Sequence, residues 1–319
     1  MKSNYRYIVK AFMAMAVIAG TTSCDDFLDR EPMSSISPET YYSTAAQLEA
    51  NLNDEYPNVL PSFGQWTYGI FGEDKGTDNQ IEVNANDRYT QDRWKVPHSE
   101  SDNWKFERIY RINFFLSEAL PKFGEDMIGS QNTISGSVAT IKHYIGEMYF
   151  LRAYEYFKKL QLFGDFPIIN QPLADEMEAL REASKRFPRN EVARFIISDL
   201  DKAYAYMSDV DMATTRINKD AAMLVKSRVA LFEATWLQNF KGTAFVPGGE
   251  GWPGASLHNN YQYPSGNIDN EVKYFLEQAV EASKLVADKY KGSLTENTGV
   301  LQQSADDPSN PYFDMFAQE

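Results

Sequence analysis

The feature that most constrains the fold of this chain is the spacing of apolar residues in one long segment, residues 141–162. Apolar side chains recur there every three or four positions, which places them on one face of a helix: Ile141, Tyr144, Ile145, Met148, Leu151 and Phe157. Gly164 and Pro167 follow directly, and these residue types commonly end a helix. The segment therefore predicts a helix that buries one face against other elements.

Five further segments show the same helical pattern, whereas no stretch alternates convincingly as a strand. They are residues 43–56, 102–120, 190–207, 218–240 and 270–290. Helix pairs that begin near residues 141 and 190, and again near 219 and 270, indicate stacked helical hairpins. The predicted fold is therefore mainly α, a tetratricopeptide-like scaffold interrupted by long loops at 164–189 and 240–269.

Several side chains have predicted roles in this scaffold. Asn190 and Asn218 are expected to cap the helices that they begin. Trp104 and Trp236 fall on apolar stripes and are expected in the core. A face of small residues should let a neighbouring helix approach closely: Ala221, Ala222, Ala230 and Ala234.

The N-terminal 23 residues are typical of a secretory signal. Three basic residues precede a short apolar run, residues 11–19, and small residues lead to Cys24, the only cysteine. A buried N-terminal helix is the alternative, but it would not explain the basic flank. Cys24 looks like a lipobox cysteine that is cleaved and acylated, although Thr21 stands where leucine or valine is usual; an unmodified, buried cysteine is the alternative. Acyl chains on Cys24 would hold the protein on a membrane.

The charge of the chain excludes one class of partner. Its net charge is −14, and removal of a signal with three basic and no acidic residues would make it −17. So acidic a surface repels nucleic acid, and no basic cluster for phosphate recognition is present. No nucleic-acid partner is expected.

Aromatic residues concentrate in the loops, where binding residues tend to lie. Trp66, Tyr68, Tyr89 and Trp94 stand among Asp, Asn and Arg, and Trp252 stands in a later loop rich in glycine and proline. Sugar rings pack on such side chains while polar neighbours meet the hydroxyls. We predict these five as ligand-binding residues, Trp94 first, with the alternative that they fasten the loops onto the helices.

Other chemistry is poorly supported, so no cofactor is expected. The pattern from Gly249 to Gly254 matches a dinucleotide loop in letters only, because no strand precedes it and Pro253 interrupts it. The three histidines lack metal-ligand spacing. The acidic run at 73–79 lacks the calcium-loop pattern, although a calcium site there stays open as an alternative. Among 45 acidic residues some carboxylate pair can always be proposed, so nothing favours a glycoside hydrolase.

Four stretches in this order resemble the SusD/RagB family of outer-membrane nutrient-binding lipoproteins. They are Cys24–Pro32 with Pro38–Tyr42, Phe150–Phe157 with Leu162–Pro167, Arg189–Val192 with Ile197–Ala203, and Arg216–Ala222 with Arg228–Phe232. Arg152, in the second stretch, is expected to pair with a carboxylate between helices, with Asp199 as the candidate; contact with a ligand is the alternative.

The resemblance implies a lipid-anchored, non-enzymatic protein that faces the cell exterior. It would bind a nutrient glycan and pass it to a TonB-dependent transporter of the SusC type. A peptide-binding importer lipoprotein and a helical-repeat scaffold without a small ligand are the alternatives. Family members run well past 319 residues, so we expect residues 24–240 to form the helical region and residues 241–319 to begin a truncated, loop-rich binding region.

Overall fold

The computed structural model describes residues 41–61, 103–124, 126–208 and 212–293. Within these ranges the chain forms seven α-helices and one short 3-10 helix, and no strand longer than an isolated bridge. The elements are α3 (Ala45–Val59), α4 (Glu107–Phe123), α5 (Val138–Phe163), α6 (Met177–Ala183), α7 (Arg189–Tyr206), α8 (Lys219–Asn239), η3 (Pro253–Ser256) and α9 (Ile268–Tyr290). The prediction of a mainly α fold is confirmed.

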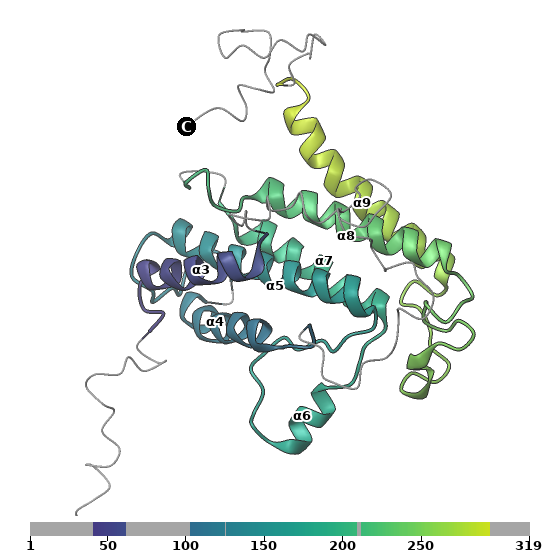
Figure 1. Ribbon diagram of the computed structural model, residues 1–319. Coiled ribbons are helices and arrows are strands. Elements are labelled where there is room, and N and C mark those ends of the chain that lie inside the picture. The colour runs from purple at the N-terminus through teal and green to yellow at the C-terminus, as the bar shows by residue number, and fades with distance from the viewer. Residues whose placement is uncertain (1–40, 62–102, 125, 209–211, 294–319) are drawn as a thin grey trace, which may run out of the picture.

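The helices stack around α5. Helices α3, α4 and α7 all pack against α5, then α8 packs on α7 and α9 packs on α8 (Figure 1). The short helix α6 lies in the connection between α5 and α7, apart from the stack, and buries none of its residues. The sequence predicted an uninterrupted loop there, because seven residues are too few to show a helical period.

Helix α5 forms the centre of the core because neighbours cover it on several sides. Its buried side chains include Ile141, Met148 and Tyr156, each fully shielded from solvent. Burial of one such side chain stabilises the fold by about 1.5–3 kcal/mol. Gly146 lets α7 approach closely, since a Cβ at this position would lie 2.9 Å from the backbone nitrogen of Met207.

Two of the three predicted helix ends are confirmed. The side chain of Asn218 caps α8 by accepting a hydrogen bond from the Ala221 backbone N–H at 2.9 Å, and Gly164 ends α5 with φ of +67°. The predicted cap at Asn190 is wrong. The N-cap of helix α7 is Pro188, two residues earlier, and the buried Asn190 side chain bonds instead to Tyr261 and Glu271 across the fold.

Ion pairs with fully buried carboxylates, which we call rungs, join the helices of the stack. The predicted pair of Arg152 on α5 with Asp199 on α7 is confirmed, with Nε to Oδ2 at 2.6 Å and Nη2 to Oδ1 at 2.8 Å. Three more rungs follow the same pattern: Arg189–Glu233 between α7 and α8, Arg194–Glu271 between α7 and α9, and Arg216–Glu147 between the segment before α8 and α5. In each rung an arginine neutralises a carboxylate whose burial without a partner would destabilise the folded protein.

The alanine face of α8 packs as predicted, whereas the two tryptophans differ from the prediction. Ala222, Ala230 and Ala234 are fully buried. Trp104 precedes α4, so no helical stripe carries it, and its half-buried ring packs at the edge of the core against Phe163 and Phe166. Trp236 does lie on α8, but it is also only half-buried. No helix among the described residues is long and apolar enough to span a bilayer.

Candidate functional site

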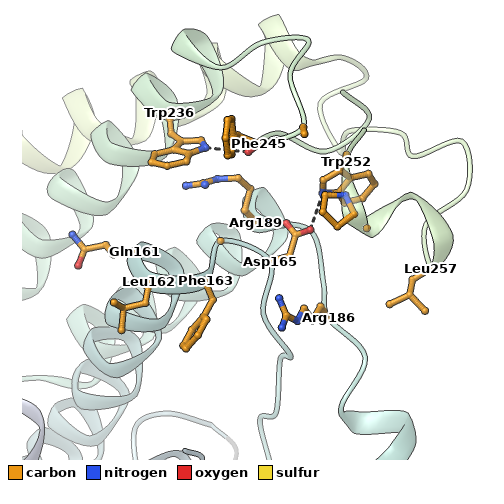
Figure 2. Close-up of a pocket in the computed structure, with 14 residues that line it drawn as sticks. Gln161, Leu162, Phe163, Asp165, Arg186, Arg189, Trp236, Phe245, Trp252 and Leu257 are labelled. Carbon is orange, nitrogen blue, oxygen red and sulfur yellow. Dashed lines mark hydrogen bonds between the residues drawn. The ribbon is translucent and has the colours of Figure 1, made fainter. Parts of the chain in front are cut away.

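A pocket of about 480 Å³ opens where the end of α5, the start of α7 and the loop between α8 and α9 meet (Figure 2). This volume falls within the range of about 300–1,000 Å³ that is usual for ligand sites. Fourteen residues line the pocket: Gln161, Leu162, Phe163, Gly164, Asp165, Arg186, Arg189, Trp236, Ala244, Phe245, Trp252, Pro253, Gly254 and Leu257.

The long connection between α5 and α7 forms one side of the pocket because its two ends are held together. Phe166 and Phe187 form an antiparallel bridge, with backbone N–H to carbonyl distances of 3.2 and 3.0 Å. The ring of Phe166 is fully buried. This bridge brings Arg186 and the first residue of α7 next to Asp165, although more than twenty positions separate them along the chain.

Asp165 fastens the opposite loop to this side. One carboxylate oxygen accepts the backbone N–H of Arg189 at 2.9 Å, and the other accepts the indole N–H of Trp252 at 2.7 Å. His258, just beyond η3, adds a hydrogen bond to the backbone oxygen of Arg186 at 2.8 Å. Burial raises the pKa of Asp165, although its hydrogen bonds and the nearby arginines oppose the shift. The carboxylate is therefore a structural anchor of the pocket wall.

Arg189 forms the inner wall. Its Nε and Nη2 atoms donate to the buried carboxylate of Glu233, at 3.0 and 2.9 Å, and its guanidinium lies 4.0 Å from the ring centroid of Trp236. Burial raises the pKa of Glu233, and the charge of Arg189 acts against that shift. The pair holds the guanidinium in a fixed orientation between Trp236 and the Asp165–Trp252 contact (Figure 2).

Apolar side chains at the rim are exposed to solvent. The exposed fractions of Phe245, Leu162 and Leu257 are 61%, 58% and 53%, so more than half of each side chain is open to solvent. The backbone of Phe245 is fixed by a hydrogen bond from the indole N–H of Trp236 to its carbonyl oxygen at 3.0 Å. Its ring contacts Phe240 edge-on, with centroids 5.5 Å apart. Phe245 is thus a positioned aromatic platform that a ligand could cover.

The pocket is suited to binding a partly apolar, partly polar molecule. Asp165 is the only carboxylate among the described lining residues, and both of its oxygens already accept hydrogen bonds. Hydrolysis of a glycosidic bond uses two carboxylates across the bond, and the described lining does not supply such a pair. Nor do the described residues contain a cluster of three or more potential metal ligands.

The five predicted ligand-binding residues have different outcomes. Trp252 lies in the pocket wall, but it is only 4% exposed and its indole N–H bonds to Asp165, so it fastens the loop as well as lining the pocket. Trp66, Tyr68, Tyr89 and Trp94 lie outside the described residues, as does the predicted lipid anchor Cys24. Their binding roles stay predictions.

Sequence reasoning missed the other pocket residues. Phe245 was not predicted to bind a ligand, and Arg189 appeared only as part of a family-like stretch. An exposed aromatic between glycines and prolines is a usable signal for Phe245. Nothing local in the sequence distinguishes Arg186 from its charged neighbours, because its place in the pocket depends on the Phe166–Phe187 bridge.

The known proteins that are similar to this chain are described as SusD-like. Residues 26–231 match a SusD-like family model described as starch-binding and associating with the outer membrane. A SusD-like protein of Formosa agariphila is 26% identical over 233 residues, which cover 67% of this chain and 41% of the relative. A second SusD-like protein of the same organism is 25% identical over 253 residues, covering 76% and 46%.

A solved SusD-like carbohydrate-binding protein from Bacteroides vulgatus aligns with a TM-score of 0.44 and 14% identity, over 78% of this chain and 45% of that protein. The chain therefore spans less than half the length of the relatives that it matches.

Proposed function

Because this chain belongs to the SusD-like family of starch-binding proteins that associate with the outer membrane, we propose that it is a nutrient-binding lipoprotein that captures a glycan. The observation that carries the proposal is the family match over residues 26–231, which spans helices α3 to α7 and most of α8. It acts by binding, without catalysis.

The pocket supports this proposal by its chemistry. Sugar rings present flat C–H faces that pack on aromatic side chains, and hydroxyls that need polar partners. Phe245 provides the displayed ring, while Gln161 and Arg186 provide exposed polar groups at the rim. Trp236 holds the backbone of Phe245 and Trp104 stacks against the Arg186 guanidinium, which reduces the entropy lost on binding.

Capture at the surface requires an anchor and a recipient. In this proposal Cys24 is acylated after removal of residues 1–23, and the protein sits on the outer leaflet of the outer membrane, facing the exterior. It delivers its ligand to a SusC-like TonB-dependent transporter. Residues 24–240 form the helical scaffold, and residues 241–319 begin the loop-rich binding region; the pocket lies where these two parts meet.

Binding measurements on purified protein test the proposal. The protein is titrated calorimetrically with a panel of neutral and acidic oligosaccharides and, separately, with peptides. We expect at least one glycan to bind without release of new reducing ends. Binding of peptides alone would favour the peptide-importer alternative, and release of reducing ends would show catalysis.

One matched pair of variants tests whether the pocket takes part. Phe245→Ala removes the displayed ring and should weaken glycan binding by about tenfold, since aromatic contacts of this kind contribute on the order of 1–2 kcal/mol. Tyr110→Ala is the control, because Tyr110 is a 51% exposed aromatic on α4 that does not line the pocket. Equal affinities of the two variants would place the glycan elsewhere on the protein.

A further inference from the structure

Arg186 carries a positive charge at the pocket that lies near Asp165 but forms no direct ion pair with a carboxylate of the described residues. It is exposed, and no carboxylate of the described residues lies within ion-pair distance. Its guanidinium instead lies over the ring of Trp104, 4.6 Å from the centroid. Stacking on an aromatic face orients a guanidinium while leaving its N–H groups available to a ligand.

Arg189 presents a second group to the same pocket. Glu233 occupies its Nε and Nη2 atoms, whereas Nη1 has no hydrogen-bond partner among the described residues. Nη1 lies 3.4 Å from the place that a Cβ would take on Gly164, so the missing side chain at Gly164 leaves this nitrogen accessible from the pocket. The residue itself is only 4% exposed, so the group is built into the wall.

The charge of the pocket differs from that of the protein. Two arginines and one aspartate line the pocket in a chain whose net charge is −14. The oxygens of Asp165 accept the Arg189 backbone N–H and the Trp252 indole N–H, and Glu233 lies behind Arg189, fully buried. A negative group is therefore repelled less here than over the acidic surface as a whole.

We propose that the glycan bound in this pocket carries an anionic group on the sugar ring, a carboxylate or a sulfate. Arg186 binds the anionic group at the rim, and the sugar ring extends past Nη1 of Arg189, which donates to a ring hydroxyl, toward Phe245; Arg189 lies between Phe245 and Arg186 in the view of Figure 2. Guanidinium N–H groups match the geometry of such oxygens, and charge-assisted hydrogen bonds are stronger than neutral ones. This inference rests on the proposed function, because it names the class of glycan.

Ligand pairs that differ only in charge provide the test. The purified chain is titrated with an oligogalacturonate and with its methyl ester, and in parallel with a sulfated galactan oligosaccharide and its desulfated form. We expect one acidic ligand to bind at least about tenfold more tightly than its neutral partner, as one charge-assisted hydrogen bond allows. Which pair shows the preference tells a carboxylate from a sulfate.

Two variants with the same change in net charge locate the effect. Arg186→Gln should reduce the preference for the acidic ligand over its neutral partner by about tenfold. Arg181→Gln is the control, because Arg181 lies on α6 with a 78% exposed side chain and does not line the pocket. It should keep the wild-type preference, and the preference should weaken with added salt.

The outcomes separate this inference from the proposed function. If the neutral partners bind as tightly as the acidic ligands, or if the two variants show the same preference, the inference is overturned while glycan binding stands. If no glycan binds and a peptide does, both the inference and the proposed function fail.

Discussion

Arg152→Met tests the central rung of the helical stack. The guanidinium makes two hydrogen bonds to Asp199 and donates through Nη1 to the side-chain oxygen of Asn113 at 2.9 Å and to the backbone oxygen of Asn170 at 3.1 Å. One side chain thus connects α5, α7, α4 and the loop after α5. Methionine keeps an apolar stem of similar length but removes every donor.

The expected cost follows from what the substitution leaves behind. Asp199 is fully buried, and without Arg152 the described residues offer it only the ammonium group of Lys202, 3.9 Å away. Removal of one partner from a buried ion pair costs about 3–5 kcal/mol, because the other charge stays buried. The double variant Arg152→Met/Asp199→Leu should recover about 2 kcal/mol or more, since an apolar pair does not carry that penalty.

Urea unfolding followed by circular dichroism measures these changes, with an unchanged slope expected for a stability effect alone. Lys284→Met is the control, because it breaks an exposed pair with Asp288 and should cost less than about 1 kcal/mol. A loss below about 1 kcal/mol in Arg152→Met, or a double variant less stable than the single one, would refute the reasoning.

Four further predictions concern packing, pH, anchoring and binding. Ala222→Phe should destabilise the protein by about 1–3 kcal/mol through overpacking, and an unchanged melting temperature would contradict this. Burial raises the pKa of Glu55 although Arg111 opposes the shift, so the ionised form is disfavoured in the folded state. As the pH rises from 4 to 7, the wild type should therefore lose stability relative to Glu55→Gln. A difference in urea midpoint between the two proteins that is the same at both pH values would count against this prediction. Cys24→Ala should move the protein out of the membrane fraction, and equal partitioning would disprove the anchor. Trp94→Ala should weaken glycan binding by about 1–3 kcal/mol with little change in stability, measured by calorimetry and thermal melting.

Periodicity predicted the helices because burial of one face is a local property of the sequence. Residues 141–162 fall inside α5, and residues 218–240 match α8 to within one residue at each end. The Arg152–Asp199 pair could also be predicted from the sequence, because a basic residue on an apolar helix face needs a buried partner.

The errors arose where tertiary contacts override local preference. Asparagine commonly caps helices, but helix α7 begins after Pro188. The Asn190 side chain forms hydrogen bonds to Tyr261 and Glu271 instead. Trp104 fits an extended helical pattern, yet α4 begins only at Glu107. Side chains that serve distant partners cannot be assigned from their neighbours in sequence.

The pocket was beyond sequence reasoning for the same reason. Its walls come from the end of α5, the start of α7 and the loop after α8, and their meeting depends on Asp165 and on the bridge between Phe166 and Phe187. Among the described residues, only Trp252 was predicted to bind a ligand and also lines the pocket.

The rungs have a consequence for cooperativity. In a helical repeat whose helices touch only adjacent neighbours, a helix packed on one neighbour can open by itself at little cost to the rest. Here Glu271 on α9 accepts hydrogen bonds from Asn190 and Arg194 on α7, so α9 is tied directly to α7 as well as packed on α8. Opening of α9 would leave the buried Asn190 without its Glu271 acceptor and Arg194 without its ion pair. We therefore expect the amides of α7, α8 and α9 to exchange with solvent through a single shared opening, as one unfolding unit.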